Sequence, residues 1–211
     1  MGYSDITGLL NAYVRKSGVV TYHGPIAEAK FLGFEGEQAR RVLFEEGPIG
    51  KLPIPAQLRG KTVFPAARTI QPGKAKGRLI GGNLSLISPC AGTPYGPDFD
   101  GAILFLEDTN EDPYRVDRML TGLWLGGHLR KIKGIVFGDF RPPQAEATAS
   151  ENSQQTAPDF SQDQVFDNLK MWTNIPIFCG LFAGHIADKL TLPIGAIVEM
   201  DADAKTLCVL D

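Results

Sequence analysis

Two segments, the continuous apolar run 102–106 (AILFL) and the segment 134–140 (GIVFGDF), apolar except for Asp139, constrain the fold of this chain more than any other feature. Each run has the length of a β-strand and shows no polar alternation, so both faces of each strand are expected to be buried. Between them, Asp112 and Pro113 mark the start of a helix with apolar residues at helical spacing. This order of strand, helix and strand predicts an α/β fold, with α+β as the alternative.

The rest of the chain shows the same alternation of helices and strands without internal repeats. Helical spacing predicts helices over 5–16, 36–46 and 163–172. Strands are expected at 19–25, 175–180 and 190–195, with a closing hairpin at 196–210. Two further segments are predicted to be irregular: a Pro-, Gly-, Lys- and Arg-rich connector between two lobes at 47–77, and a solvated loop at 141–163.

Composition excludes several classes of function. The 211 residues suffice for one sizeable domain, or for one domain and part of another. The net charge of −3 leaves no basic footprint for nucleic acid or anionic lipid. No apolar run has the length of a membrane span, and the start of the chain lacks the pattern of a signal peptide. We therefore expect no nucleic-acid partner and no membrane association.

The cysteines and histidines are too widely spaced for a disulfide framework or a zinc site. The three cysteines are Cys90, Cys179 and Cys208, and the three histidines are His23, His128 and His185. Their spacing predicts no metal and no cofactor, and the cysteine pattern suits a reducing, cytoplasmic environment.

Ser4 lies in GYSD, a tight turn that leads directly into the predicted helix 5–16. A serine nucleophile needs a base and backbone N–H donors for the oxyanion, and the N–H of Asp5 at the helix start is one such donor. The turn is similar to a nucleophile elbow, but GYSDI lacks the second glycine of G-x-S-x-G. The alternative is an ordinary helix cap, in which the serine accepts an N–H hydrogen bond.

Glu107 and His185 are the other two residues with a candidate catalytic role. Glu107 follows the strand 102–106, and the carboxyl ends of strands are where ligands gather in α/β sheets. His185 follows a glycine, and histidine is a natural general base. Ser4, Glu107 and His185 thus form a plausible serine hydrolase triad. The alternatives are a solvent-facing strand-end acid, with four acids in LEDTNED to choose from, and a loop histidine without function.

The other two histidines favour structural roles. His23, in HGP, is interpreted as a turn residue that bonds the backbone. His128 ends the helix 112–128, where a cation suits the helix dipole.

Taken together, several motifs resemble those of the LD-carboxypeptidases, a serine peptidase family that includes the microcin C immunity peptidases. In chain order they are GYSDIT, HGP, GRLIGGNL, AGTPYGPDFDGAILFLEDTNEDPYRVDRML, GIVFGDF and GHIADKLTLPIG. The resemblance runs through nearly the whole chain and is weakest in 26–76 and 141–163.

This resemblance implies a role for five residues. The serine of the GYSD motif, here Ser4, is the nucleophile, the glutamate of the LED strand end, here Glu107, is the acid, and the histidine of the GH loop, here His185, is the base. The amide after the nucleophile, here Asp5, donates to the oxyanion, and Asn83 of GGNL shapes the substrate cleft. No metal and no cofactor are implied.

The resemblance also implies a substrate. Family members cut the amide between an L-configured centre, commonly that of meso-diaminopimelate, and a terminal D-alanine, which trims murein tetrapeptides in the cytoplasm during cell-wall recycling. The immunity relatives cut an amide that links a peptide to a modified nucleotide. Because murein peptides carry several carboxylates, Arg or Lys is expected to line the cleft. Family members are commonly dimers, so a homodimer is expected.

One departure from the family pattern concerns what precedes GYSD. In the family a Rossmann-like N-terminal lobe comes first and supplies a strand before the nucleophile and a second oxyanion donor. On this basis residues 1–58 are the remnant of that lobe, 59–76 a linker and 77–211 the C-terminal LD-carboxypeptidase domain. We expect Ser4 to fray, an apolar patch to be exposed for association, and activity of the chain alone to be weak or absent. The alternatives are a non-catalytic remnant that serves as a binding module, or a split enzyme completed by a second polypeptide.

Overall fold

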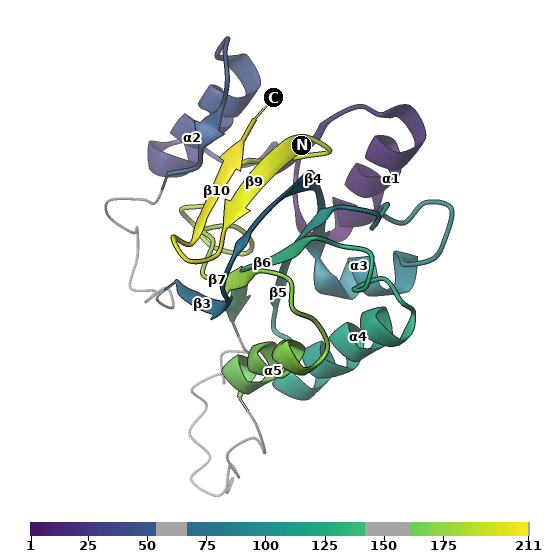
Figure 1. Cartoon of the computed structure of the whole chain (residues 1–211). Coiled ribbons are helices and arrows are strands. Elements are labelled where there is room, and N and C mark those ends of the chain that lie inside the picture. Colours follow the sequence, from purple (N-terminus) through teal and green to yellow (C-terminus); the bar gives the residue numbers. More distant parts are fainter. Residues whose placement is uncertain (54–66, 142–160, 211) are drawn as a thin grey trace, which may run out of the picture.

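The computed structural model describes residues 1–53, 67–141 and 161–210. Its main element is a mixed sheet of eight strands in the order β2-β10-β9-β4-β5-β6-β7-β3 (Figure 1). The strands β4 to β7 run parallel to one another, and the pairs on either side of them are antiparallel. The strand bounds are β2 Gly50–Lys51, β3 Arg68–Gln71, β4 Lys74–Asn83, β5 Ile103–Thr109, β6 Gly134–Arg141, β7 Ile177–Cys179, β9 Ile197–Asp201 and β10 Thr206–Val209.

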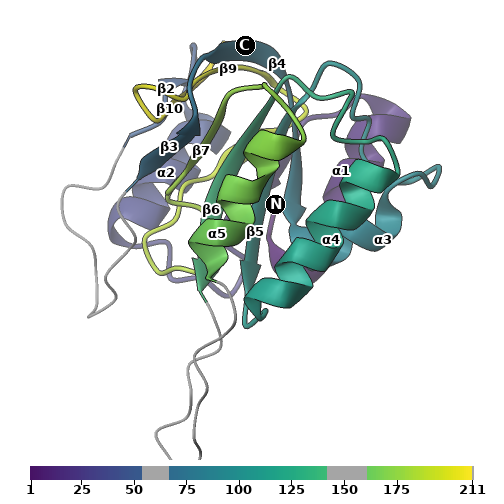
Figure 2. The same cartoon turned by 60° about the horizontal axis from the view of Figure 1, so that its bottom comes forward.

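A separate two-stranded ribbon pairs β1 (Thr21–His23) with β8 (Leu192–Ile194). The helices are α1 (Thr7–Ser17), α2 (Gly33–Phe44), α3 (Leu84–Cys90), α4 (Pro113–Leu125) and α5 (Gln162–Asn168), with the 3₁₀ turns η1 (Ser4–Ile6) and η2 (Leu169–Met171). Figure 2 shows α4 and α5 in front of the strands, whereas α2 lies behind them.

The core lies on both faces of the sheet, as the apolar run 102–106 predicts. Side chains of β5 alternate between the faces. Leu104 and Leu106 pack with α4 and α5 in one buried cluster, whereas Ile103 and Phe105 pack with β8 and β9 in another. All four side chains are fully buried. The parallel strands with helices between them confirm the α/β class.

The interpretation of residues 47–77 as an irregular connector is wrong for part of this segment. β2, β3 and the start of β4 lie within it, and all three pair in the main sheet. The edge strands β2 and β3 and the exposed first half of β4 carry polar and charged residues, as solvent-facing strands do, so the apolar signal is weak. Lys74, for example, forms an ion pair of 2.9 Å with Asp201 of β9.

Two other predictions fall wholly or partly on residues that the structure does not describe. Most of the solvated loop predicted at 141–163 lies outside the described residues, and so does the first half of the linker predicted at 59–76. The division of the chain into 1–58, 59–76 and 77–211 stays a prediction.

Candidate active site

The two acids at the end of β5 point to opposite faces of the sheet and have different partners. Glu107 accepts a hydrogen bond from Nδ1 of His185, with 2.8 Å between Nδ1 and Oε2. Asp108 instead accepts hydrogen bonds at the start of α3, from the backbone N–H and the hydroxyl of Ser85 and from the side-chain amide of Asn83. The alternation of a strand therefore separates a helix-capping acid from the acid that contacts the histidine.

Burial dominates the electrostatics of Glu107. Its side chain is fully buried, whereas that of His185 is 19% exposed. Burial raises the pKa of the Glu107 carboxyl, and the hydrogen bond from His185 opposes this rise without cancelling it. A carboxylate at Nδ1 holds the imidazole in one orientation and favours the tautomer that leaves Nε2 to act as a base.

Two glycines let the loop that carries His185 pass close to the sheet. Gly184 has a φ of +122°, and a Cβ at this position would lie 2.9 Å from Oε2 of Glu107. A Cβ on Gly138, in the irregular stretch of the β5–β6 pairing, would lie 2.4 Å from the carbonyl oxygen of Ala183. The backbone N–H of Asp139 donates to that same carbonyl at 2.8 Å. The close approach of loop and strand thus requires glycine at both 138 and 184.

Ser4 lies on a strained turn that begins α1. Its φ of 61° is in the left-handed region, which a non-glycine residue rarely adopts and which recurs at functional turns. The residue before it, Tyr3, is extended, and the Tyr3 ring packs edge-on against the His185 ring with 4.9 Å between centroids. Ser4, the candidate nucleophile, therefore directly follows Tyr3, whose side chain contacts the candidate base His185.

No strand precedes this turn among the described residues, as expected, but an isolated bridge holds it. Gly2 forms a parallel bridge with His23. The N–H of Gly2 donates to the carbonyl of Tyr22, and the N–H of Gly24 donates to the carbonyl of Gly2, both at 3.0 Å. These bonds extend the β1–β8 ribbon by one short segment and fix the residues that precede Ser4.

Asp5 and Asn83 have different surroundings. Asp5 is exposed in the first turn after Ser4, where its N–H is next to the serine. Asn83 is only 3% exposed, and its side chain caps α3 by accepting from the N–H of Leu86 while it donates to Asp108. Its side chain also opposes, in small part, the rise in the pKa of Glu107 that burial causes. These contacts favour a positioning role for Asn83 over direct contact with a substrate.

His23 and Lys189 join the site although the sequence motifs do not single them out for it. The interpretation of His23 as a backbone-bonding turn residue is wrong, because neither of its buried ring nitrogens has a hydrogen-bond partner within the described part of the chain. Its ring packs on Phe105 at 5.0 Å, and burial and the nearby Lys189 lower its pKa to about 3. The motif HGP is the signal that could have drawn attention to His23, but it does not reveal that this side chain is buried.

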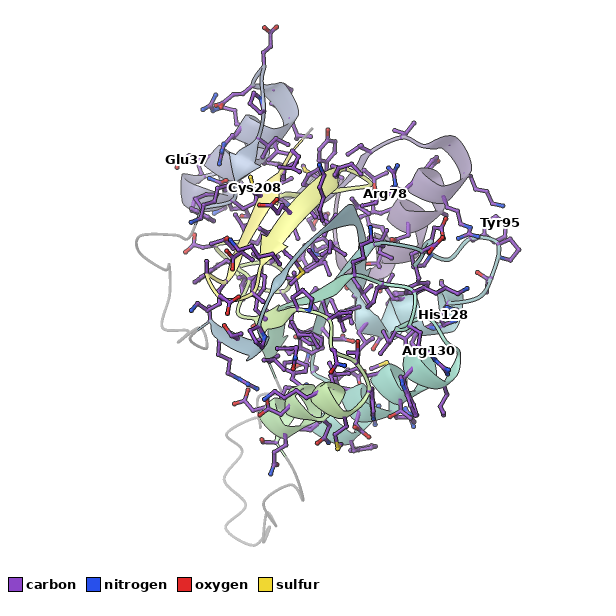
Figure 3. All side chains as sticks on the ribbon, in the orientation of Figure 1. Glu37, Arg78, Tyr95, His128, Arg130 and Cys208 are labelled. Atoms are coloured by element: carbon purple, nitrogen blue, oxygen red, sulfur yellow. The ribbon has the colours of Figure 1, made fainter. Side chains whose placement is uncertain are left out.

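His128 lies apart from this site. It follows the end of α4 beside α3, and its ring contacts Phe99 with 4.7 Å between centroids (Figure 3). Burial lowers its pKa. Within the described residues the three cysteines are free thiols, and no group of three or more His, Cys, Asp and Glu side chains is placed to hold a metal ion.

The family follows from a comparison with known proteins. The profile of the LD-carboxypeptidase C-terminal domain matches residues 76–200, which is more than half of the chain. The chain belongs to the LD-carboxypeptidase family. The match includes Glu107 and His185 and confirms the resemblance that the motifs indicate.

Individual LD-carboxypeptidase relatives extend this match over the whole chain. The chain is 34% identical over 214 residues to the probable murein peptide carboxypeptidase of Bacillus subtilis, with 99% of this chain and 61% of the relative covered. It spans 61% of the length of this relative and 63% of the length of a putative carboxypeptidase of Synechocystis, to which it is 35% identical.

Two solved structures of LD-carboxypeptidase relatives share the fold. The crystal structure of muramoyltetrapeptide carboxypeptidase from Oxalobacter formigenes is 29% identical, with a TM-score of 0.77 over 100% of this chain and 67% of that one. An MccF-like protein from Bacillus anthracis is 27% identical, with a TM-score of 0.79 over 99% of this chain and 66% of that one.

A membrane-spanning segment is not found among the helices that the structure describes, since none is both long and apolar enough.

Proposed function

We propose that this chain carries the catalytic triad of a serine carboxypeptidase that cuts murein tetrapeptides between meso-diaminopimelate and the terminal D-alanine. Ser4 is the nucleophile, His185 the general base and Glu107 the acid that orients it. The observation that carries the proposal is the 2.8 Å hydrogen bond from His185 to a buried Glu107, next to the strained turn of Ser4.

The proposed reaction follows from these groups. Nε2 of His185 takes the proton of Ser4 while the hydroxyl oxygen attacks the scissile carbonyl carbon, and the N–H of Asp5 donates to the oxyanion that forms. His185 then returns the proton to the departing amine of D-alanine, which leaves an acyl ester on Ser4. Water, deprotonated by His185, attacks this ester, and His185 returns the proton to Oγ of Ser4 as the tripeptide leaves. Glu107 stabilises the imidazolium in both halves of the reaction.

We propose that the 211 residues alone are impaired as an enzyme. In the family a preceding lobe supplies the second oxyanion donor, and the loss of one such donor costs about 2.7–4 kcal/mol of transition-state stabilisation, or about 10²–10³-fold in kcat. We also propose that the reaction takes place in the cytoplasm and that the protein is a homodimer. Association through exposed apolar residues such as Leu9, Tyr13 and Phe44 is the alternative mode of assembly.

The direct test is incubation of the chain with a murein tetrapeptide, followed by mass spectrometry. We expect slow release of D-alanine, and we expect Ser4→Ala to abolish it. Ser17→Ala is the matched control, because Ser17 is an exposed serine at the other end of α1. Release that Ser4→Ala leaves unchanged would remove the assigned nucleophile, and turnover equal to that of a full-length homologue would refute the impairment.

Two alternatives make different predictions in the same assay. A binding module that keeps the fold without the chemistry binds the tetrapeptide but releases no D-alanine. An immunity-type peptidase, which the similarity to an MccF-like protein favours, instead cleaves an amide between a peptide and a modified nucleotide. Offering both substrates in parallel therefore decides between the three.

A further inference from the structure

Lys189 lies in the loop that carries His185, four residues further along the chain and just before β8. Its side chain is only 7% exposed. The loop is closed by a hydrogen bond of 2.7 Å from the N–H of Leu190 to the carbonyl of Phe182. The backbone of Lys189 is therefore held at the site by the same fold that positions the base.

The Lys189 ammonium has weak partners for a buried charge. Its Nζ lies 3.7 Å from the centroid of the Tyr3 ring, which is a cation–π contact. The carboxylate of Glu35, on α2, is 3.8 Å away, which is an ion pair but exceeds hydrogen-bond length. Among the described residues no hydrogen bond to this ammonium is present. A buried ammonium ordinarily needs hydrogen bonds to offset its desolvation. The three N–H donors of Lys189 can therefore still bind an acceptor from a ligand.

The position of Lys189 suits contact with the substrate residue next to the scissile bond. Lys189 and His185 contact the same ring, that of Tyr3, which precedes Ser4. The ammonium and the imidazole therefore lie within about 9 Å of each other, and an extended peptide covers about 3.3–3.6 Å per residue, so at most three substrate residues are needed to span this distance. A carboxypeptidase releases the C-terminal residue of its substrate. The charge that every such residue carries is its terminal carboxylate, which lies close to the scissile bond and therefore to the base.

We propose that Lys189 binds the terminal carboxylate of the substrate and so restricts the site to peptides with a free C-terminus. The inference rests on the proposed function. In the free protein the Lys189 ammonium contacts the Glu35 carboxylate and the Tyr3 ring. In the complex the substrate carboxylate accepts hydrogen bonds from the ammonium. A charge-assisted hydrogen bond of this kind changes affinity by about ten- to a hundredfold.

The competing explanation is that Lys189 only ties α2 to the loop through Glu35. In that case Lys189→Met and Glu35→Gln would lower stability alike and neither would alter the choice of ligand. In the proposed role the two substitutions have opposite effects on binding. Lys189→Met removes the carboxylate receptor, whereas Glu35→Gln removes its competitor.

The experiment compares two peptides that differ in one group. A murein tetrapeptide ending in D-alanine and the same peptide ending in D-alaninamide are titrated into the Ser4→Ala protein by calorimetry, because this background cannot consume the ligand. We expect the acid to bind about ten- to a hundredfold more tightly than the amide. Lys189→Met should abolish the preference, Lys189→Arg should keep most of it and Glu35→Gln should increase it. Lys170→Met, which removes an exposed lysine on η2, should leave it unchanged.

Equal affinity for acid and amide in the Ser4→Ala protein, absence of binding of both peptides, or a preference that survives Lys189→Met would overturn the inference. Circular dichroism checks that each variant is folded, and if Lys189→Met is not, Lys189→Arg and Glu35→Gln decide. Hydrolysis by the unsubstituted chain is followed separately. A carboxylate preference that depends on Lys189, found without any hydrolysis through Ser4, would support this inference and refute the proposed function.

Discussion

Glu107→Gln replaces one carboxylate oxygen of the proposed triad by an NH₂ group and nearly preserves the shape of the side chain. The substitution removes the negative charge 2.8 Å from Nδ1 of His185. It also gives the side chain an NH₂ group that can donate to Nδ1, which favours the tautomer with the proton on Nε2. That tautomer cannot take the proton of Ser4.

The size of the effect follows from the contact distance. With an effective dielectric constant of about 20, opposite unit charges 2.8 Å apart attract by about 6 kcal/mol. Since about 1.36 kcal/mol corresponds to a factor of ten in rate, this loss slows the reaction by about 10⁴-fold. The corresponding replacement of the triad acid by its amide, Asp by Asn, in a serine protease lowers kcat by about 10⁴-fold.

Two measurements test this expectation without relying on full peptidase activity. The first is the rate at which a fluorophosphonate reagent modifies Ser4, followed by intact-protein mass, which we expect to fall by about 10⁴-fold. The second is the ¹⁵N spectrum of the His185 imidazole, which we expect to show a proton on Nδ1 in the unsubstituted chain and on Nε2 in the variant. Glu111→Gln, in the same acidic segment and paired only loosely with Arg115, is the matched control. Labelling within tenfold of the unsubstituted rate, with an unchanged tautomer, would refute the reasoning.

The same variant makes a separate prediction about stability. Burial raises the pKa of Glu107 above its ordinary value of 4.5, so the folded state holds this proton more tightly than the unfolded state. The stabilisation is fully present below pH 4.5 and is lost as the pH rises through the folded-state pKa. The free energy of unfolding of the unsubstituted chain, relative to that of Glu107→Gln, should therefore fall as the pH rises from 4.5, as measured by urea unfolding at several pH values. An increase with pH would contradict the assigned cause.

Two further substitutions test the fold around the site. Gly184→Ala should lower the free energy of unfolding by about 1–3 kcal/mol and displace His185 from Glu107, because φ at Gly184 is +122° and the new Cβ would lie 2.9 Å from Oε2 of Glu107. Unchanged urea unfolding and an unchanged ¹⁵N spectrum of His185 would disprove this. Leu120→Ala, on the fully buried face of α4, should cost about 2–5 kcal/mol, whereas Leu125→Ala, 66% exposed on the same helix, should change stability by less than about 0.5 kcal/mol. Equal costs for the two leucines would contradict the packing.

The sequence predicts the interior of this fold better than its edges. The runs 102–106 and 134–140 are buried on both faces, so their apolar residues leave an unmistakable pattern and become β5 and β6. The sequence pattern of 47–77 predicts a connector because edge strands carry charges on their solvent side, and only the pairing partners show that β3 and β4 are strands. Edge strands depend on neighbours that are distant in the sequence, which local patterns do not contain.

At the candidate site, sequence motifs identify groups but not their orientation. LEDTNED offers several acids, and only the alternation along β5 decides that Glu107 faces His185 while Asp108 caps α3. His23 and Lys189 escape notice for a related reason. Their part in the site depends on burial against Tyr3 and Phe105, which come from other segments of the chain.

Four features that cost stability gather around Tyr3 and its neighbour His185, and this argues for chemistry over a purely structural role. Ser4 adopts a left-handed conformation, Glu107 is an acid whose burial raises its pKa, His23 is buried without a hydrogen-bond partner within the described residues, and Lys189 is an ammonium without a close acceptor there. Each costs about 1–3 kcal/mol or more on its own. A scaffold selected only to fold would gain stability from apolar side chains at the last three positions and glycine at the first. Their concentration at Tyr3 and at His185, which packs on the Tyr3 ring, is the pattern of a site in which polar groups are held ready for a ligand.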